Sequence, residues 1–446
     1  MDLGELTAVE TASAVRSGEV SALEVCDAAI DRIEATDGPI NAVVVRDFDR
    51  ARAAAKALDA EGAKGDERPL IGVAMTVKES NNVAGLPTTW GFEAHANHMV
   101  DRDSVVVERL KAAGAVIVGK TNAPVALADW QSGNPIYGRT VNPLDHSRTP
   151  GGSSGGASAA LAAKMTPLEI GSDIGGSIRV PAHFCGVYGH KPTYGLVPGR
   201  GHDYPGSDSL DAALAVVGPM ARSARDLSVT MEVIQGPADP GMKPDLLMPR
   251  FEALSDCRVL VMTGHPLAKT ASAVSGAIRK LASDLMDQGA DIAFEGPTPD
   301  LAKMHKTYVD MLTTVISRDT PDPRPTTAHH WMALMDEQMR VTRAWRELFA
   351  DFDVVLAPTL GVTAFPLTDE PDWNARHLMI DGEKTRFGEQ LAFAGLATFP
   401  GLPSTAVPLA VDDDGLPTGV QIMGPPYGDP ITLGFAERLQ AAGLAL

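Results

Sequence analysis

Two stretches carry most of the information in this chain: Gly151-Gly152-Ser153-Ser154-Gly155-Gly156, and Gly-Ser-Asp-Ile-Gly-Gly-Ser-Ile-Arg at residues 171–179. Glycines that precede a serine let the backbone turn sharply, so that successive N–H groups can face one point. Beside a nucleophile such as Ser177, a cluster of this kind forms an oxyanion hole. Taken alone, the second stretch is equally compatible with a tight turn in a large α/β protein.

The first stretch has an obvious rival interpretation as a phosphate-binding loop. No Gly-Lys-Ser or Gly-Lys-Thr follows residues 151–156, so the P-loop pattern fails, and Gly-x-Gly-x-x-Gly after a strand is absent as well. Double glycines on both sides of Ser153 and Ser154 instead predict an unusual backbone, with a cis peptide bond among these residues.

Lys78 closes an apolar run that begins at Val73. A lysine at the end of a strand is usually solvated, and that interpretation is the ordinary one for this residue alone. A lysine buried away from water loses its proton more easily and can act as a base. Two glycine-flanked serines and one buried lysine are the parts of a nucleophilic hydrolase that needs no histidine.

The amino-acid composition and net charge limit the kinds of protein that this chain can be. The 446 residues are 44% hydrophobic and 21% charged, which is ordinary for a globular protein. The net charge of −19 disfavours a nucleic-acid partner, because phosphate binding needs a basic surface. The N-terminus has no signal-peptide pattern and no run of about 18 apolar residues occurs, so we expect no membrane span and a cytoplasmic location. Three cysteines without paired spacing predict neither a disulfide framework nor a zinc site.

The pattern of elements predicts an α/β fold with a mixed, mostly parallel central sheet that helices cover on both faces. Strand and helix signals alternate along the chain. A capping box at Ser21 and Glu24 begins one helix, and residues 70–78 are expected to form a buried strand that ends at Lys78. Later strands are expected at 115–119, 259–262, 291–294, 354–357 and 419–423, and helices at 48–60, 105–113, 155–164, 268–288 and 431–443.

The two glycine–serine stretches with Lys78 resemble the amidase signature family of serine hydrolases. Ser153 lies 75 residues after Lys78, and Ser177 lies 24 residues after Ser153, which agrees with the family. Further matching motifs are Gly-Lys-Thr-Asn at 119–122, Cys-Gly-Val-Tyr-Gly at 185–189 and Gly-Leu-Pro at 401–403 and 415–417. The resemblance implies a single amidase domain over 1–446, divided into an N-terminal helical segment (1–65), a catalytic core (66–230), a variable segment that can contribute to the substrate pocket (236–345) and the C-terminal part of the core (350–446).

The resemblance also implies roles for individual residues. Ser177 is expected to be the acylated nucleophile, Ser153 the bridging serine beside a cis peptide bond, and Lys78 the general base. The backbone N–H groups of Ile174, Gly175, Gly176 and Ser177 are expected to form the oxyanion hole. No metal and no cofactor is implied, and a basic pH optimum follows because Lys78 must be neutral at rest.

Other polar residues near the nucleophile have plainer interpretations. His183 and His190 permit a Ser-His-Asp mechanism, but no Gly-x-Ser-x-Gly elbow surrounds Ser177, so packing roles are favoured. Asp173 and Arg179 are expected to hold the nucleophile loop by charge-assisted hydrogen bonds.

Substrate contacts are predicted from the loop after residues 119–122. It contains Leu127, Trp130 and Tyr137, and an apolar wall favours a neutral, hydrophobic or aromatic acyl group, although Leu127 and Trp130 also suit the core. Ser153 and Ser154 are included among the substrate-binding residues. The region 300–345, with His329, His330, Trp331 and several methionines, is a candidate for the opposite wall.

Three functions are compatible with these residues. The first is a stand-alone amidase for a small-molecule carboxamide. The second is the glutamine-hydrolysing subunit of a transfer-RNA-dependent amidotransferase, and the third is a non-catalytic protein that kept the fold. Because dimers are frequent in the family, a homodimer is included among the expected assemblies.

Overall fold

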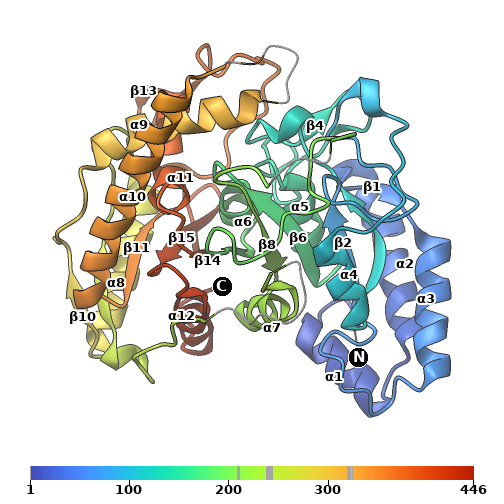
Figure 1. Ribbon diagram of the computed structural model, residues 1–446. Coiled ribbons are helices and arrows are strands. Elements are labelled where there is room, and N and C mark those ends of the chain that lie inside the picture. The colour runs from blue at the N-terminus through green and yellow to red at the C-terminus, as the bar shows by residue number, and fades with distance from the viewer. Residues whose placement is uncertain (1, 208–210, 238–244, 319–322, 324) are drawn as a thin grey trace.

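A large mixed sheet organises the computed structural model, which describes residues 2–446 except 208–210, 238–244, 319–322 and 324. Its strands lie in the order β1-β3-β2-β6-β8-β7-β14-β15-β11-β9-β10 (Figure 1). The bounds of these strands are β1 (Val43–Arg46), β2 (Ala74–Lys78), β3 (Val116–Thr121), β6 (Leu168–Asp173), β7 (Tyr188–Lys191), β8 (Val216–Ala221), β9 (Arg258–Val261), β10 (Asp291–Ala293), β11 (Val354–Pro358), β14 (Ser404–Val411) and β15 (Pro417–Met423). Two small hairpins add β4 (Gly133–Asn134) with β5 (Gly138–Arg139), and β12 (His377–Ile380) with β13 (Glu383–Arg386).

The helices pack around this sheet. They are α1 (Ala8–Ser17), α2 (Ala22–Ile40), α3 (Phe48–Glu61), α4 (Val105–Ala112), α5 (Gly155–Ala162), α6 (Arg179–Cys185), α7 (Ala224–Ile234), α8 (Ser272–Asp287), α9 (Leu301–Ser317), α10 (Ala328–Asp351), α11 (Leu391–Thr398) and α12 (Asp429–Ala441). Within the described residues, no helix is both long and apolar enough to cross a lipid bilayer.

The expected α/β architecture with a mixed sheet is confirmed. Parallel pairs occur in two groups, β3-β2-β6 and β11-β9-β10, and the strands between these groups pair antiparallel. In the first group the carboxyl ends of β2 and β6 lie side by side, because Thr76 pairs with Glu169 and Val77 with Ile170. This parallel register brings Lys78 close to the loop that follows β6.

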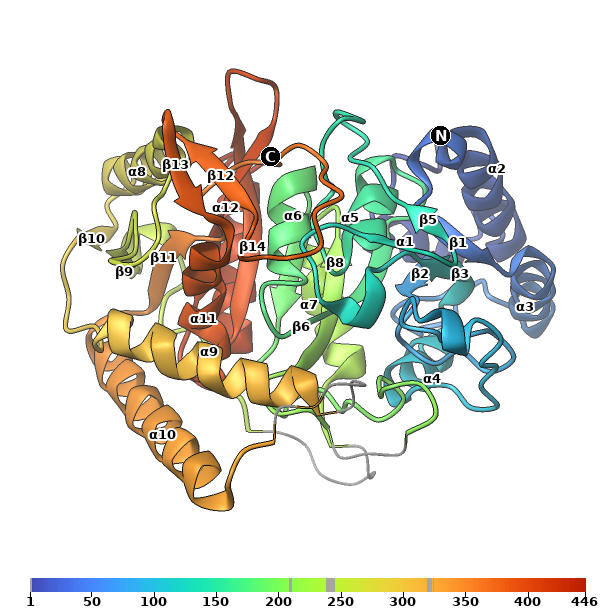
Figure 2. The ribbon, with the colours of Figure 1, turned by 90° about the horizontal axis from the view of Figure 1, so that it is seen from above.

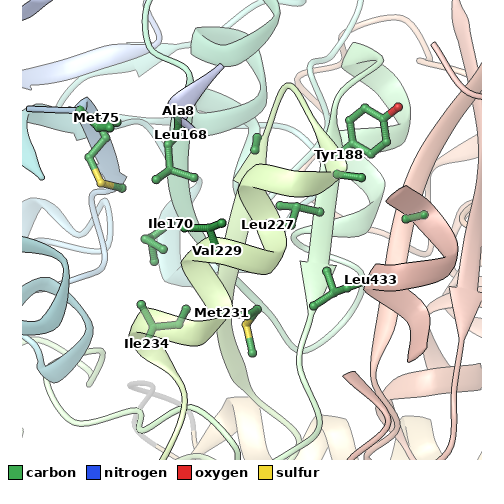
Figure 3. Close-up of a cluster of buried hydrophobic side chains, with 14 of the residues drawn as sticks. Ala8, Met75, Leu168, Ile170, Tyr188, Leu227, Val229, Met231, Ile234 and Leu433 are labelled. Atoms are coloured by element: carbon green, nitrogen blue, oxygen red, sulfur yellow. The ribbon is translucent and has the colours of Figure 1, made fainter. Parts of the chain in front are cut away.

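Helices cover both faces of the sheet, as alternate residues of single strands show. Met220 and Ala406 point into a small cluster with α5 and α6, whereas their chain neighbours Ala221 and Val407 belong to a larger cluster beneath α7 and α12. Because successive side chains of a strand point to opposite faces, the two helix pairs lie on opposite sides. Figure 3 shows the larger cluster, in which side chains of α7 meet those of β6 and β2.

Local signals explain the helix bounds. The capping box predicted at Ser21 and Glu24 is present, since Ser21 Oγ accepts from Glu24 N and Glu24 accepts from Ser21 N. The helix α2 runs on through Pro39 to Ile40. Asn41 ends it in the left-handed conformation, with φ of 60°.

The region 300–345 forms two helices that the sequence analysis did not define. Here α9 packs against α10 and α11. Figure 2 shows α9 beside α11, and a hydrogen bond from Tyr308 of α9 reaches Ile174 in the loop that follows β6.

Candidate active site

Lys78 is the last residue of β2 and is completely buried. Its Nζ lies 2.6 Å from Ser153 Oγ and 2.9 Å from Ser172 Oγ. Burial lowers the pKa of Lys78 to about 7, and the nearby charges of Asp173 and Glu169 oppose this shift only in part. A large fraction of this side chain is therefore a neutral amine near neutral pH, as a general base requires.

Ser153 is held in a tight backbone turn before α5. The peptide bond between Gly152 and Ser153 is cis, and the family resemblance implied a cis bond beside Ser153. A Cβ at Gly152 would lie 2.3 Å from the carbonyl oxygen of Asp129, so only glycine fits there. The hydroxyl of Ser132 supports the turn from behind, because it donates towards the carbonyls of Gly151 and Ser153 and accepts from Gly155 N at 3.0 Å.

Ser154 lies behind the site rather than in it, which corrects the prediction that it contacts substrate. Its side chain is completely buried, and its Oγ lies 3.3 Å from both the backbone nitrogen and the carbonyl oxygen of Ser172. Its own N–H donates to the Ser177 carbonyl at 3.1 Å. Ser154 therefore joins the two glycine–serine stretches to each other.

Ser177 stands on the short loop between β6 and α6. The carboxylate of Asp173 organises this loop, because it accepts from the backbone N–H groups of Gly176 and Ile178 at 2.8 and 3.1 Å. Arg179 binds the same carboxylate through Nε and Nη2 at 3.0 and 2.9 Å, as the sequence predicted. Burial by itself would raise the pKa of Asp173, but the charge and hydrogen bonds of Arg179 outweigh it and lower the pKa to about 2.

Distant residues hold Arg179 in turn. Its Nη2 donates to Thr398 Oγ1 at 2.8 Å, and its Nη1 donates to Gln421 Oε1 at 2.8 Å. The loop that carries Ser177 is thus tied to α11's last residue and to β15 through one buried guanidinium.

The four backbone groups predicted for the oxyanion hole are not equivalent. Gly176 N–H is already engaged by Asp173 Oδ1 at 2.8 Å, which differs from the expectation that all four point at one acceptor. Within the described part of the chain, the backbone donors of this loop that are bound by Asp173 are those of Gly176, Ile178 and Arg179, and the N–H groups of Ile174, Gly175 and Ser177 have no protein acceptor. These three remain available to an oxyanion, and Ile174, Gly175 and Ser177 all line the same cavity.

A cavity of about 440 Å³ opens over the two serines. Ser153, Ser172 and Ser177 lie at its polar end, and Ser177 is only 6% exposed. Among the described residues no hydrogen bond joins the hydroxyls of Ser153 and Ser177, so the side chain of Ser177 must turn to close a relay. Such contacts commonly tighten only when substrate binds.

One wall of the cavity is aromatic. Trp90, Phe92 and Tyr204 line it, with ring centroids 6.2 Å apart for Trp90–Tyr204 and 5.2 Å apart for Phe92–Tyr204. His202 joins them, because its ring lies 5.2 Å from that of Trp90 and its Nε2 lies 3.0 Å from Ser80 Oγ. Burial, and then the charge on Lys78, lower the pKa of His202 to about 3, so this imidazole is neutral.

The opposite wall is formed by α9. Val309, Leu312 and Ile316 recur at helical spacing and line the cavity. The region 300–345 therefore does contribute a wall, as expected, but His329, His330 and Trp331 do not line the cavity.

The three residues predicted as substrate contacts in the loop after residues 119–122 differ in where they lie. Leu127 lines the cavity, whereas Tyr137 does not. Trp130 also borders it but is only 2% exposed, and its Nε1 donates to the Gly175 carbonyl at 2.9 Å. Its ring packs on those of Trp373 and Phe387, at centroid distances of 4.9 and 5.3 Å, so Trp130 mainly supports the nucleophile loop.

The histidines and cysteines near the nucleophile have structural roles. His183 Nε2 lies 2.9 Å from the Val362 carbonyl, and His190 lies between Thr405 and Asp429. Burial raises the pKa of the Cys185 thiol to about 12, and the cysteines are free thiols. The described residues contain no group of three or more His, Cys, Asp or Glu side chains arranged to hold a metal ion.

Sequence reasoning missed several residues of this site. Ser172 was part of the quoted second stretch, and its position five residues before Ser177 was a usable signal. The aromatic wall comes from two loops far apart in sequence, so no local pattern could have joined Trp90 to Tyr204.

Comparisons with known proteins agree with this geometry. The family model described as amidase matches residues 24–320 and 315–433. An indoleacetamide hydrolase from Bradyrhizobium diazoefficiens is 33% identical, with 97% of this chain and 86% of the relative covered. A glutamyl-tRNA(Gln) amidotransferase subunit from Roseiflexus castenholzii is 31% identical over 98% of this chain and 96% of the relative. The solved structure of a 6-aminohexanoate cyclic dimer hydrolase complexed with substrate superimposes with a TM-score of 0.84 at 27% identity, covering 99% of this chain and 98% of that chain.

Proposed function

Because the chain belongs to the amidase signature family of amide hydrolases, we propose that it cleaves the C–N bond of a carboxamide through a Ser177 acyl-enzyme. The observation that carries this proposal is the buried contact of 2.6 Å between Lys78 Nζ and Ser153 Oγ at the polar end of the cavity that Ser177 lines. A serine–serine–lysine relay needs a base of this kind and no histidine.

The chemistry proceeds in two halves. The neutral amine of Lys78 takes the proton of Ser153 Oγ as Ser153 takes the proton of Ser177 Oγ, and Ser177 Oγ bonds to the carbonyl carbon. The proton returns along the relay to the leaving nitrogen as the C–N bond breaks, which releases ammonia or an amine. Water then loses a proton to the same relay, attacks the ester carbon and frees the carboxylic acid and Ser177.

The negative charge that develops on the carbonyl oxygen needs donors at a fixed place. The N–H groups of Ile174, Gly175 and Ser177 are available for this role, and each such donor typically changes kcat by about 10²–10³. Arg179 does not bind substrate in this proposal, because its guanidinium is completely buried and engaged by Asp173.

The walls of the cavity support a neutral substrate with an aromatic or aliphatic group. Trp90 and Tyr204 provide one apolar face, and Leu312 provides the other. An apolar pocket with a few convergent polar groups binds a ligand of the same character. The indoleacetamide hydrolase among the relatives, whose name specifies an arylalkyl amide, is consistent with this class.

The alternative function is glutamine hydrolysis as part of a transfer-RNA-dependent amidotransferase. The glutamyl-tRNA(Gln) amidotransferase subunit from Roseiflexus castenholzii supports it. Glutamine carries an ammonium and a carboxylate, which the aromatic and aliphatic walls bind poorly, although Asp203, Asp211 and Arg318 also line the cavity. We therefore rank it below the stand-alone amidase.

A release assay separates the two. Phenylacetamide, indoleacetamide, acetamide, an anilide and glutamine are incubated with the wild type and with Ser177→Ala, and the product acid is quantified. We expect turnover of the arylalkyl amides that disappears in Ser177→Ala, together with loss of fluorophosphonate labelling. Amide turnover that persists in Ser177→Ala would refute the nucleophile, and turnover of glutamine alone would favour the amidotransferase function.

Three further proposals concern organisation. They are a single amidase domain over 1–446 with the segments defined above, a cytoplasmic location and a homodimer. Limited proteolysis, cell fractionation and analytical ultracentrifugation test them in that order.

A further inference from the structure

We propose that Tyr308, on α9, is a positioning residue that aims the Gly175 N–H at the substrate oxygen. This inference rests on the proposed amide hydrolysis and adds a part to its oxyanion hole. Tyr308 lies in the variable segment, 131 residues after the nucleophile, so the sequence analysis gave it no role.

The contact that carries the proposal is a hydrogen bond to the backbone of the nucleophile loop. Tyr308 Oη donates to the Ile174 carbonyl oxygen at 2.8 Å. That carbonyl belongs to the peptide unit whose nitrogen is Gly175 N. In a trans peptide the C=O and N–H bonds point in opposite directions, so a donor that holds the oxygen on one side aims the N–H to the other. The Gly175 N–H has no hydrogen-bond acceptor among the described residues.

The hydrogen bond also strengthens the donor that it positions. A peptide whose carbonyl accepts a hydrogen bond becomes a better N–H donor, because hydrogen bonds in a chain polarise one another. The chain here would run from the Tyr308 hydroxyl through one peptide unit to the developing oxyanion. It is effective because the Tyr308 side chain is completely buried.

The ring of Tyr308 is itself held in place. A Cβ at Gly395 would lie 2.7 Å from Tyr308 Cδ1, so the ring packs directly on the backbone of α11. The ring of Phe399 lies at a centroid distance of 6.4 Å. These contacts direct the hydroxyl towards the Ile174 carbonyl and the neighbouring side chain of Thr398, with which it also interacts.

The next peptide unit, between Gly175 and Gly176, is held by side chains at both its C=O and its N–H. Trp130 Nε1 donates to the Gly175 carbonyl at 2.9 Å, and the N–H of that peptide, on Gly176, donates to Asp173 at 2.8 Å. Two consecutive peptides are thus held by side chains from separate segments. Of these two peptides, only the one between Ile174 and Gly175 presents its N–H to the cavity. Among the described residues, Tyr308 is the only side chain that binds the carbonyl of this peptide.

The test is Tyr308→Phe, which keeps the ring and removes the hydroxyl. The matched control is Tyr188→Phe, since Tyr188 Oη also donates to a backbone carbonyl, that of Leu446 at 2.7 Å, but outside the cavity. Three quantities are measured for each protein: kcat and KM with phenylacetamide or with the best amide of the panel, inhibition by benzyl trifluoromethyl ketone, which forms an oxyanion on Ser177, and inhibition by phenylacetate, which does not.

We expect Tyr308→Phe to lower kcat about tenfold, a part of the effect of losing a whole oxyanion donor. KM and inhibition by phenylacetate should stay near the wild-type values, while the trifluoromethyl ketone should bind about tenfold more weakly. Tyr188→Phe should change none of these. Wild-type kcat in Tyr308→Phe, a loss confined to KM, or an equal loss in both variants would overturn the proposal.

A second variant covers the case in which Tyr308→Phe is poorly folded, as judged by its melting temperature. Gly395→Ala places a Cβ 2.7 Å from Tyr308 Cδ1 and so displaces the ring while keeping the hydroxyl, and it should also weaken the ketone more than phenylacetate; equal weakening of the two ligands would count against the inference. Failure of the parent proposal looks different, because then the wild type itself would turn over no amide or Ser177→Ala would remain active.

Discussion

Removing the hydroxyl of Ser172 should shift the pH dependence of the enzyme to more acid values. In Ser172→Ala the ammonium form of Lys78 loses one of two acceptors, at 2.9 Å, and keeps Ser153 Oγ at 2.6 Å. Lys78 itself is completely buried and does not line the cavity, so alanine at position 172 supplies no new acceptor to its ammonium. The neutral amine loses less, because it needs fewer acceptors, so the variant favours deprotonation of Lys78.

The size of the pKa shift at Lys78 follows from the strength of the hydrogen bond to Ser172 that is lost. A hydrogen bond to a charged group contributes about 1.5–3 kcal/mol, and 1.36 kcal/mol corresponds to one pKa unit. The pKa of Lys78 is about 7 in the wild type, with burial as its main cause. Wild-type kcat/KM should therefore be full above this pH and fall about tenfold per unit below it. In Ser172→Ala this acid limb should lie roughly 1–2 units lower.

The assay is kcat/KM for phenylacetamide, or the best amide of the panel, as a function of pH. The control is Ser158→Ala, because Ser158 is also buried, but its hydroxyl bonds to the carbonyls of Pro150 and Gly155, each at 3.1 Å, and interacts with the Cys185 side chain rather than with Lys78. The control should keep the wild-type midpoint even if its plateau changes. An acid limb of Ser172→Ala that stays in place or moves to higher pH would refute the reasoning, and a flat wild-type profile down to about pH 5 would refute Lys78 as the base.

Three other variants test the support of the site. Arg179→Met leaves Asp173 as an unpaired buried carboxylate, so urea unfolding should show a loss of about 3–5 kcal/mol, and a loss below about 1 kcal/mol would contradict this account. Gly156→Ala places a Cβ 2.3 Å from a backbone nitrogen and should lower the free energy of unfolding by about 1–3 kcal/mol. Its control is Gly276→Ala on α8, whose Cβ meets nothing within 4 Å and which should raise that free energy by about 0.5–1 kcal/mol. Similar values for the two variants would contradict this account. Trp90→Ala should raise KM for phenylacetamide about tenfold with little change for acetamide, and equal effects on both amides would remove Trp90 from the aromatic wall.

The sequence predicted those parts of the site whose signals are local. Glycine spacing singled out Ser153 and Ser177, and the apolar run singled out Lys78 without deciding between a solvated and a buried side chain. The three signals together carried the resemblance to the family, because each lies within a few residues of the group it describes. The opposite charges of Asp173 and Arg179, six positions apart, likewise predicted the observed ion pair.

The remainder depends on contacts between distant segments. Tyr308 reaches Ile174 across 134 positions of the chain, and no periodicity in α9 separates this residue from an ordinary core tyrosine. The engagement of Gly176 N–H by Asp173 was missed for another reason: glycine spacing shows that a backbone can turn, but it does not show which N–H group a neighbouring carboxylate takes.

The guanidinium of Arg179 has a consequence for the timing of biosynthesis. It connects the nucleophile loop to Thr398 and Gln421, which leave the ribosome 219 and 242 residues later. The strand β7 likewise pairs with a strand that is synthesised much later, because its Gly189 pairs with Ala406 of β14. A nascent chain that already contains Lys78, Ser153 and Ser177 therefore lacks the distant partners that hold Arg179, and hydrolytic competence should arrive abruptly, only when the last strands have been synthesised.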